Sequence, residues 1–299
     1  MSSNIELIKQ LRDRTGAGLM DCKKALAENN NDVEASVTWL REKGIAKQAK
    51  KASSRIAAEG VAWVMAKGNT AAIIEVNSET DFVANSDPFR ALVKEVNEIV
   101  LANAPKTLDE AKASKNGEGK SINDLFVDAG VKLGEKLDFR RFEIVTKSDD
   151  EVFGPYIHMN GKIATLVVLK GGNAEVANGV ALNVCSNNPA YINENDIPAD
   201  VIAKETEVQT EAAHNDPSFA KKPAAIQAKI VAGKVNKVLF ESVLVDEPFI
   251  FDDSKTVGQY LKENGASVVK TVRYAVGEGI EKRQDDFAAE VAAQASAGK

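Results

Sequence analysis

The sequence predicts an α+β protein whose core is a duplicated unit, in which helices cover a three-stranded antiparallel sheet. Strand-like apolar runs alternate with segments of helical periodicity, and the order hairpin, helix, closing strand occurs twice. Only 6% of the residues are aromatic and alanine is abundant, which favours helices over strands in number. With 299 residues, the chain is long enough for about two domains.

Residues 1–55 are predicted to form a module of three short helices. Each helix has an apolar stripe at helical spacing, and residues 15–18 (TGAG) separate the first from the second. Asn31, with Glu34 three residues later, is typical of a capping box at the start of the third. A module this small has a limited core, so we expect an appendage. A basic connector follows it, with Lys43, Lys47, Lys50, Lys51 and Arg55.

The two copies of the core unit are assigned to residues 56–147 and to residues 148–196 with 240–278. In the first copy, apolar runs at 61–66 and 71–76 flank a turn, and a helix opens at Asp87-Pro88. Residues 107–137 are predicted to be helical with a weak break at 115–119, before a closing strand at 141–145. Aligning Gly161 with Gly68 places residues 164–169 on 71–76, and 272–276 is the second closing strand.

Two further segments complete the predicted architecture. Residues 197–239, which interrupt the second copy, are polar and helical and read as an antiparallel helical hairpin. The apolar seam of this hairpin is too thin for a domain core, so a partner or a second copy of the chain would cover it. Residues 279–299 form a C-terminal helical module with an amphipathic piece around Phe287 and Val291.

The sequence offers no catalytic or metal-binding constellation. His158 and His214 are the only histidines, and Gly119-Lys120-Ser121 lacks the glycine that a phosphate loop needs five positions earlier. We therefore expect no cofactor, no metal site and no enzymatic activity. The two separated cysteines, and the lack of a signal peptide or an apolar 18-residue run, predict a cytoplasmic protein without a membrane span.

The net charge of −6 argues against a chain that binds nucleic acid over its whole surface. The basic connector leaves a second hypothesis open, namely a nucleic-acid-binding or ribosome-associated module. Salt-dependent RNA binding that is lost when Lys47, Lys50 and Lys51 are neutralised would distinguish it. An unrecognised enzyme is a third hypothesis, which the missing catalytic residues disfavour.

The stretch Thr80-Asp81-Phe82-Val83 is the most informative part of the chain. It follows the strand predicted at 71–76, in a connection where binding residues often lie. Phe82 either packs on its own sheet or is an exposed anchor for a partner. The equivalent place in the second copy, Lys170 to Asn173, has no aromatic residue, so the shared fold does not require one. This asymmetry favours the partner-facing reading.

Three long sequence blocks resemble the elongation factor Ts family of bacteria, over nearly the whole chain. They are residues 11–26 (LRDRTGAGLMDCKKAL), residues 75–84 (EVNSETDFVA), and residues 254–259 (SKTVGQ), which continue to 276–282 (VGEGIEK). The resemblance implies a guanine-nucleotide exchange factor for the GTPase elongation factor Tu. It also implies a UBA-like fold for the N-terminal three-helix module.

The resemblance implies specific contacts with the GTPase. Thr80, Asp81, Phe82 and Val83 would enter beside the nucleotide site and help to dislodge Mg²⁺, with Phe82 as a wedge in an apolar pocket. Further contacts implied by the family are Arg12, Leu19, Met20, Lys23, His158 and Ile250. Residues 279–299 resemble the module that clasps the partner. No direct nucleotide binding is expected, and self-association through the helical hairpin stays open.

Overall fold

The computed structural model describes residues 4–15, 17, 19–52 and 55–281. The chain divides into two compact units. Unit 1 comprises Met1–Ala62, Ile74–Phe142 and Ala275–Lys299, and unit 2 comprises Trp63–Ile73 and Glu143–Tyr274. The amphipathic piece expected around Phe287 and Val291 lies outside the described residues.

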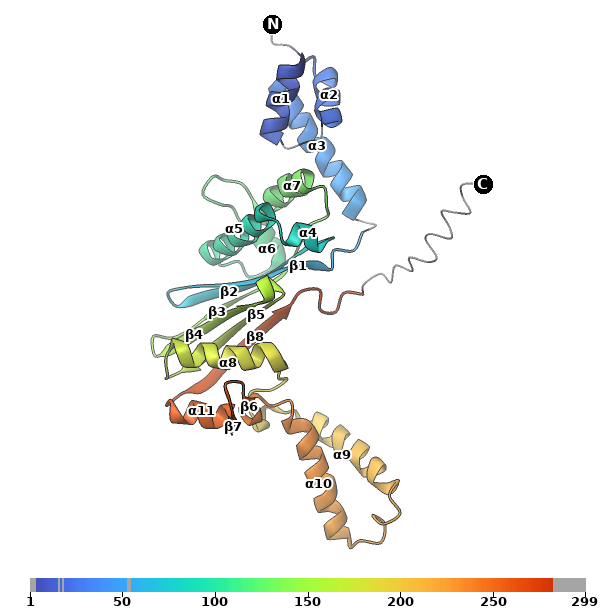
Figure 1. Ribbon diagram of the computed structural model, residues 1–299, viewed down its shortest axis with the longest axis vertical. Helices are drawn as coiled ribbons and strands as arrows, with labels where there is room; N and C mark the ends of the chain where they lie inside the picture. Colours follow the sequence, from blue (N-terminus) through green and yellow to red (C-terminus); the bar gives the residue numbers. More distant parts are fainter. Residues whose placement is uncertain (1–3, 16, 18, 53–54, 282–299) are drawn as a thin grey trace, which may run out of the picture. The chain divides into compact units, whose positions relative to one another are not determined.

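The N-terminal part of unit 1 contains three helices: α1 (Asn4–Thr15), α2 (Leu19–Glu28) and α3 (Val33–Ala52) (Figure 1). Leu11, Cys22 and Leu26 are the centre of a small apolar core. The capping residue of α3 is Asp32 instead of Asn31, because the Asp32 carboxylate accepts the N–H of Ala35 at 2.9 Å. Helix α3 also continues into the basic connector as far as Ala52, where alanines and lysines are good helix formers.

The first sheet has the strand order β1–β2–β3. Its strands are β1 (Glu59–Lys67), β2 (Thr70–Ser78) and β3 (Asp138–Thr146), with β2 in the centre. Residues 71–78 of β2 are all buried. A two-residue connection at Gly68 and Asn69 joins β1 to β2, as antiparallel neighbours allow. This sheet confirms the predicted hairpin and its closing strand.

Four helices follow β2: α4 (Asp81–Ala84), α5 (Asp87–Asn103), α6 (Leu108–Ala113) and α7 (Ile122–Leu133). The helical segment predicted for 107–137, with its break at 115–119, corresponds to α6 and α7 and the loop between them. The chain is interrupted because Ser121 begins a new helix through a capping box with Asp124, in which the Ser121 hydroxyl accepts the Asp124 N–H at 3.1 Å. The polar residues 115–119 form the loop between α6 and α7.

The second sheet has the order β4–β5–β8, formed by β4 (Glu151–His158), β5 (Ile163–Lys170) and β8 (Ser267–Ala275). Strands β4 and β5 are antiparallel, with Tyr156 opposite Thr165. Helix α8 (Ala174–Asn187) packs on this hairpin. Helices α5 and α8 both end in a left-handed residue, Ala104 and Asn188, directly before a proline. These matching features confirm the α+β class and are those expected of a duplication.

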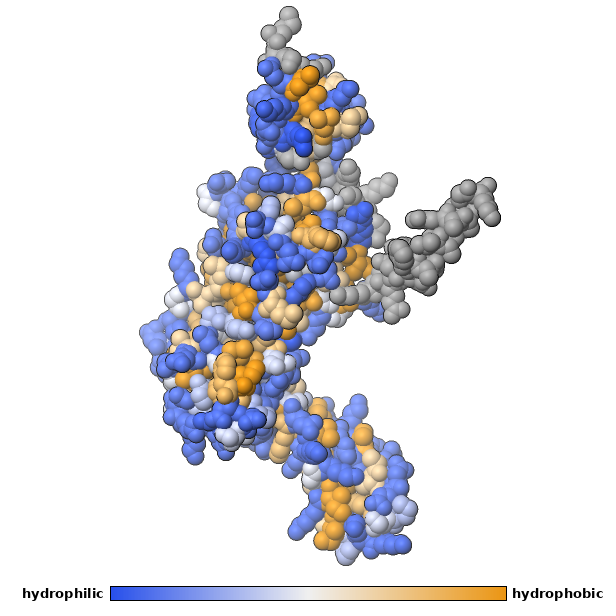
Figure 2. Space-filling model, in the orientation of Figure 1, coloured by the Kyte–Doolittle hydropathy of each residue, from blue (hydrophilic) through white to orange (hydrophobic). Residues whose placement is uncertain are grey.

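The insertion consists of α9 (Ala199–His214) and α10 (Ala224–Phe240), which pack against each other (Figure 1). Phe219, Val231, Val235 and Leu239 belong to the small apolar cluster between them. Ile202, Val208 and Ile226 stay exposed, and the hairpin carries several apolar patches in Figure 2. After α10, the chain forms a feature that the sequence did not predict, with β6 (Pro248–Phe249), β7 (Asp252–Thr256) and α11 (Val257–Glu263).

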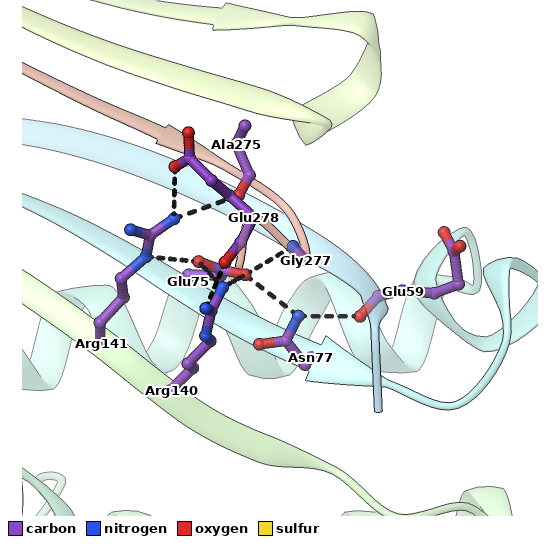
Figure 3. Close-up of polar contacts among 8 residues, drawn as sticks. All are labelled: Glu59, Glu75, Asn77, Arg140, Arg141, Ala275, Gly277 and Glu278. Atoms are coloured by element: carbon purple, nitrogen blue, oxygen red, sulfur yellow. Dashed lines mark hydrogen bonds and ion pairs between the residues drawn. The ribbon is translucent and has the colours of Figure 1, made fainter. Parts of the chain in front are cut away.

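A buried carboxylate organises the polar interior of unit 1 (Figure 3). Glu75, in β2, has no exposed surface, and Arg140 and Arg141 of β3 both donate to it, at 2.9 Å (Nη1 to Oε1) and 2.5 Å (Nε to Oε2). The backbone N–H of Gly277 donates to Oε1 at 2.8 Å, and the Asn77 amide donates to the same oxygen at 3.1 Å. One side chain therefore joins two strands to the segment that follows β8.

The two arginines extend this network to the same C-terminal segment. Arg141 donates from Nη2 to the carbonyl of Ala275 at 3.1 Å, and Arg140 donates to the carbonyl of Glu278. Burial alone raises the pKa of Glu75, but the Gly277 N–H, Arg140 and Arg141 together outweigh burial and hold this pKa below its usual range. The charged form of Glu75 is thus the one that the fold stabilises.

We expect Glu75→Gln to lower the free energy of unfolding at neutral pH by about 3 kcal/mol, because the variant removes the buried negative charge that two partly buried arginines share. Because the folded-state pKa is lowered, this contribution is present above the ordinary carboxyl pKa of about 4.3 and is lost as the pH falls through the folded-state value. Urea unfolding at several pH values measures both effects.

Glu143→Gln is the matched control, since Glu143 makes a solvent-exposed pair with Lys270. We expect it to change stability by well under about 1 kcal/mol. Equal losses for the two variants would contradict the assignment of Glu75 as the central interaction.

Candidate interaction site

The Thr80–Val83 stretch forms a short, well-defined helical turn. The Thr80 hydroxyl accepts the N–H of Val83 at 3.3 Å and so caps α4. At the other end, the N–H of Asn85 donates to the Asp81 carbonyl at 2.9 Å, and the Ser86 hydroxyl donates to the Val83 carbonyl at 2.7 Å. The backbone of all four residues is therefore held in one conformation.

This turn buries its last residue and exposes the aromatic one. Ala84 is buried, Val83 is half-buried, and Asp81 is exposed. Phe82 is 84% exposed, so it does not pack on its own sheet. The aromatic residue that fills the core here is Phe89, which is fully buried in α5. An apolar ring of this size, kept in water on a fixed turn, is suited to a partner's pocket.

The structure brings three of the four N-terminal site residues together. Arg12, Leu19 and Lys23 line a groove between α1 and α2, which also exposes the apolar side chain of Ile5. Met20 is 70% exposed but does not line this groove. The groove combines apolar surface with three cationic side chains, since Lys9 lines it as well, and with the carboxylate of Asp13, an arrangement suited to a partly acidic protein surface.

His158 and Ile250 both belong to unit 2 but lie on different elements. His158 is the last residue of β4, and its Nδ1 is 3.1 Å from the hydroxyl of Tyr156. Ile250 lies between β6 and β7, next to Phe251, which is 68% exposed. No hydrogen bond or ring contact joins His158 to Ile250 in the part of the chain that the structure describes.

The described residues include no group of three or more His, Cys, Asp or Glu side chains that could hold a metal ion. Within the same residues, no helix has the length and apolar character that crossing a membrane requires. The exposed apolar side chains of Phe82 and Ile250 stand on hydrogen-bonded backbone, and such side chains suit protein binding.

A family model described as elongation factor TS matches residues 79–278, about two thirds of the chain. The chain belongs to the elongation factor Ts family. Membership gives it a role in translation elongation and protein biosynthesis, as a nucleotide exchange factor and not as a catalytic enzyme in the usual sense, and it implies elongation factor Tu as the partner. The matched region of this elongation factor Ts chain includes Thr80–Val83, His158 and Ile250.

Sequence reasoning missed the residues that fix these exposed groups. In this elongation factor Ts chain, the carboxylate of Glu135 accepts the N–H of Thr80 at 3.1 Å, although the two residues are 55 positions apart. No local pattern connects them. The only signal in the sequence is Gly134, which ends α7 in a left-handed conformation and directs the chain towards β3.

A second missed residue, Asn183 of α8, holds the segment that carries Ile250. Its Oδ1 accepts the N–H of Ile250 at 2.9 Å, and its Nδ2 donates to the carbonyl of Pro248 at 2.8 Å. Beside this clamp, the ring of Phe249 stacks on that of Tyr260 with 3.9 Å between centroids. The exposed residues Ile250 and Phe251 of this elongation factor Ts chain therefore rest on an ordered base.

Glu247 adds a buried carboxyl group to the same clamp. It is 5% exposed, its Oε2 accepts from Asn187 at 3.0 Å and from Asn183 at 3.4 Å, and its Oε1 has no hydrogen-bond partner among the described residues. Burial raises the pKa of Glu247, although the two amides offset part of this effect. The amides supply hydrogen bonds to this carboxylate but no positive charge.

We expect Glu247→Gln to raise the free energy of unfolding at about pH 7.5 by about 1 kcal/mol, because burial disfavours the charged form of the wild-type carboxyl group and the amide carries no such cost. Since the folded-state pKa is raised, the stability that the protonated acid contributes is lost as the pH rises from the ordinary carboxyl value of about 4.3 through the folded-state value. The advantage of the variant should disappear at about pH 4.

Thermal unfolding at the two pH values measures this difference, with the exposed Glu241→Gln as the control. An advantage for Glu247→Gln that is the same at both pH values would show that charge is not its cause.

Proposed function

We propose that this chain accelerates GDP release from elongation factor Tu by inserting Phe82 into the GTPase beside its nucleotide site. The observation that carries the proposal is the 84% exposure of Phe82 on a capped turn whose backbone is hydrogen-bonded at both ends. Membership of the elongation factor Ts family supports it as well. The chain binds the GDP-bound GTPase, promotes loss of the nucleotide, and is displaced when GTP binds.

The thermodynamic basis is reciprocal coupling between two ligands of one GTPase. If the chain binds the nucleotide-free GTPase more tightly than the GDP-bound form, then GDP and the chain weaken each other's binding by the same factor. Fully burying a Phe side chain contributes about 1.5–3 kcal/mol. A contact that forms only in the nucleotide-free conformation adds this amount to the coupling and requires no bond-making step.

Displacement of Mg²⁺ provides the second component of the proposed mechanism. The ion neutralises the phosphates of bound GDP, so its loss weakens the hold of the GTPase on the nucleotide. Thr80, Asp81, Phe82 and Val83 act together here: Phe82 is the wedge, the exposed carboxylate of Asp81 makes polar contacts, and the other two residues shape the turn.

Further contacts spread the interface over both units. Arg12, Leu19, Met20 and Lys23 bind the GTPase domain, and the groove that three of them line supports this assignment. His158 and Ile250 face the same partner, and residues 279–299 clasp it. In this proposal the chain binds no nucleotide or nucleic acid itself and acts in the cytoplasm, and the 197–239 hairpin is available for self-association.

We expect Phe82→Ala to reduce stimulated GDP release about ten- to a hundredfold, the factor that corresponds to the loss of one buried aromatic contact. Stopped-flow release of a fluorescent GDP analogue from elongation factor Tu measures the rate. Because Phe82 is exposed in the free chain, its replacement should leave the thermal unfolding midpoint unchanged.

Val269→Ala is the control, since Val269 is another exposed apolar residue, on β8, with no assigned contact. An unchanged rate for Phe82→Ala would contradict the proposed insertion of Phe82 into the GTPase. An equal loss of GDP-release rate in Phe82→Ala and Val269→Ala would mean that the effect is not specific to Phe82.

Removal of Mg²⁺ tests the other component. When a chelator removes the ion from the GTPase beforehand, we expect the rate difference between wild type and Phe82→Ala to shrink, because there is no ion left to displace. The same stopped-flow assay with excess Mg²⁺ and with excess chelator measures both ratios. A ratio that stays constant would contradict the displacement of Mg²⁺ by this turn.

A further inference from the structure

Glu135 lies in the short connection between α7 and β3, in unit 1. It follows Gly134, whose left-handed conformation (φ 75°) ends α7 and turns the chain away from the helix axis. Glu135 is half-buried and far in sequence from the exposed turn. Its side chain nevertheless makes three hydrogen bonds to the start of that turn.

The carboxylate of Glu135 binds both backbone and side-chain donors. Its Oε2 accepts the N–H groups of Glu79 and Thr80, each at 3.1 Å. Its Oε1 accepts the Thr80 hydroxyl at 2.6 Å. The same hydroxyl accepts the N–H of Val83, so Glu135, Thr80 and Val83 form one continuous chain of hydrogen bonds. Hydrogen bonds to an ionised acceptor are about twice as strong as neutral ones.

The contact is reciprocal between the two segments. The carboxylate of Glu79 accepts the backbone N–H of Lys136 at 2.6 Å, while Glu79 also pairs with Arg55 at 2.8 Å. Glu79 and Thr80, at the start of the turn, are thus hydrogen-bonded to Glu135 and Lys136, which follow α7. A clamp of this kind resists both sliding and rotation of the turn.

The turn needs an external support of this kind. Helix α4 has only four residues, too few to be stable by its own backbone hydrogen bonds. Phe82 contributes little to its stability because the ring is exposed. Order in α4 therefore comes from its cap, from Ala84 on the core, and from the carboxylate that holds the capping residue.

We propose that Glu135 is a positioning residue for the Phe82 turn: it touches no nucleotide or metal, and it pre-orders Phe82 for entry into the GTPase. This inference rests on the proposed function. A flexible turn must lose conformational entropy when it binds, and the Glu135 clamp removes most of that cost before the partner arrives. Because this saving in entropy favours only the insertion of Phe82, Glu135 should accelerate GDP release only in a chain that has the Phe82 ring.

The test is a double-mutant cycle on the full-length chain, with stimulated GDP release as the measurement. We expect Glu135→Ala to slow release about tenfold, the effect of losing roughly one charge-assisted hydrogen bond. In a Phe82→Ala background, the same change should have almost no further effect. A residue that supported only the general fold would slow release by the same factor in both backgrounds.

Glu135→Gln is the conservative variant. It keeps an oxygen for the two backbone N–H groups and an amide that can bond the Thr80 hydroxyl, so we expect most of the rate to be retained. Glu98→Ala, an exposed glutamate on α5, is the matched control and should leave the rate unchanged.

The outcomes separate this inference from the proposed function. If Phe82→Ala leaves the rate unchanged, the wedge itself fails. If Phe82→Ala slows release but Glu135→Ala does not, or slows it equally in both backgrounds, the positioning role is overturned. If Glu135→Ala fails to fold, Thr80→Val takes its place in the cycle, because it removes the hydroxyl that joins Glu135 to Val83 with little change in volume.

Discussion

The buried carboxylate of Glu75 is the constraint on which the rest of unit 1 depends. A fully buried charge requires several donors, and Glu75 obtains them from β2, from β3 and from the backbone after β8 (Figure 3). These segments are distant in sequence, so their common carboxylate specifies one arrangement among them. Strand β2 carries Glu75 and leads directly into the Thr80 turn. The exposed ring of Phe82 therefore follows directly after the strand that carries this buried network.

In both regions that carry predicted contacts, a side chain distant in sequence hydrogen-bonds the backbone that holds an exposed apolar residue. The supporting side chain is a carboxylate in one region and an amide in the other. At Thr80, an anionic Glu135 binds neutral donors and holds a turn that presents an aromatic ring. At Ile250, a neutral amide, Asn183, uses both its oxygen and its nitrogen to hold the segment between β6 and β7. Each support is buried or half-buried, and each apolar group that it presents is exposed. In the proposed function, the supporting residue thus contributes to folding and the exposed apolar residue contributes to recognition.

The sequence predicted the repeating parts of the fold because they follow from local periodicity. Both hairpins, the helices that follow them and the closing strands lie where apolar spacing and turn residues indicated. The errors have local causes of a different kind: Asp32 caps the third helix instead of its neighbour Asn31, and β6 and β7 are too short to show alternation. The supports of the site could not be predicted, because Glu135 and Asn183 act on residues 55 and 67 positions away. The sequence shows Glu75 as an acidic residue within an apolar run. No local pattern indicates that Arg140 and Arg141 are its partners.

The exposure of Phe82 has a consequence for how this protein can change over evolutionary time. Most core positions are constrained by folding, since a substitution there alters packing and stability together. Position 82 is free of that constraint, because its side chain contacts little of its own chain. Under the proposed function, selection can therefore adjust the size and shape of this side chain to a changing partner without a loss of stability. The proposed contribution of this residue to exchange and the stability of the fold can then vary independently.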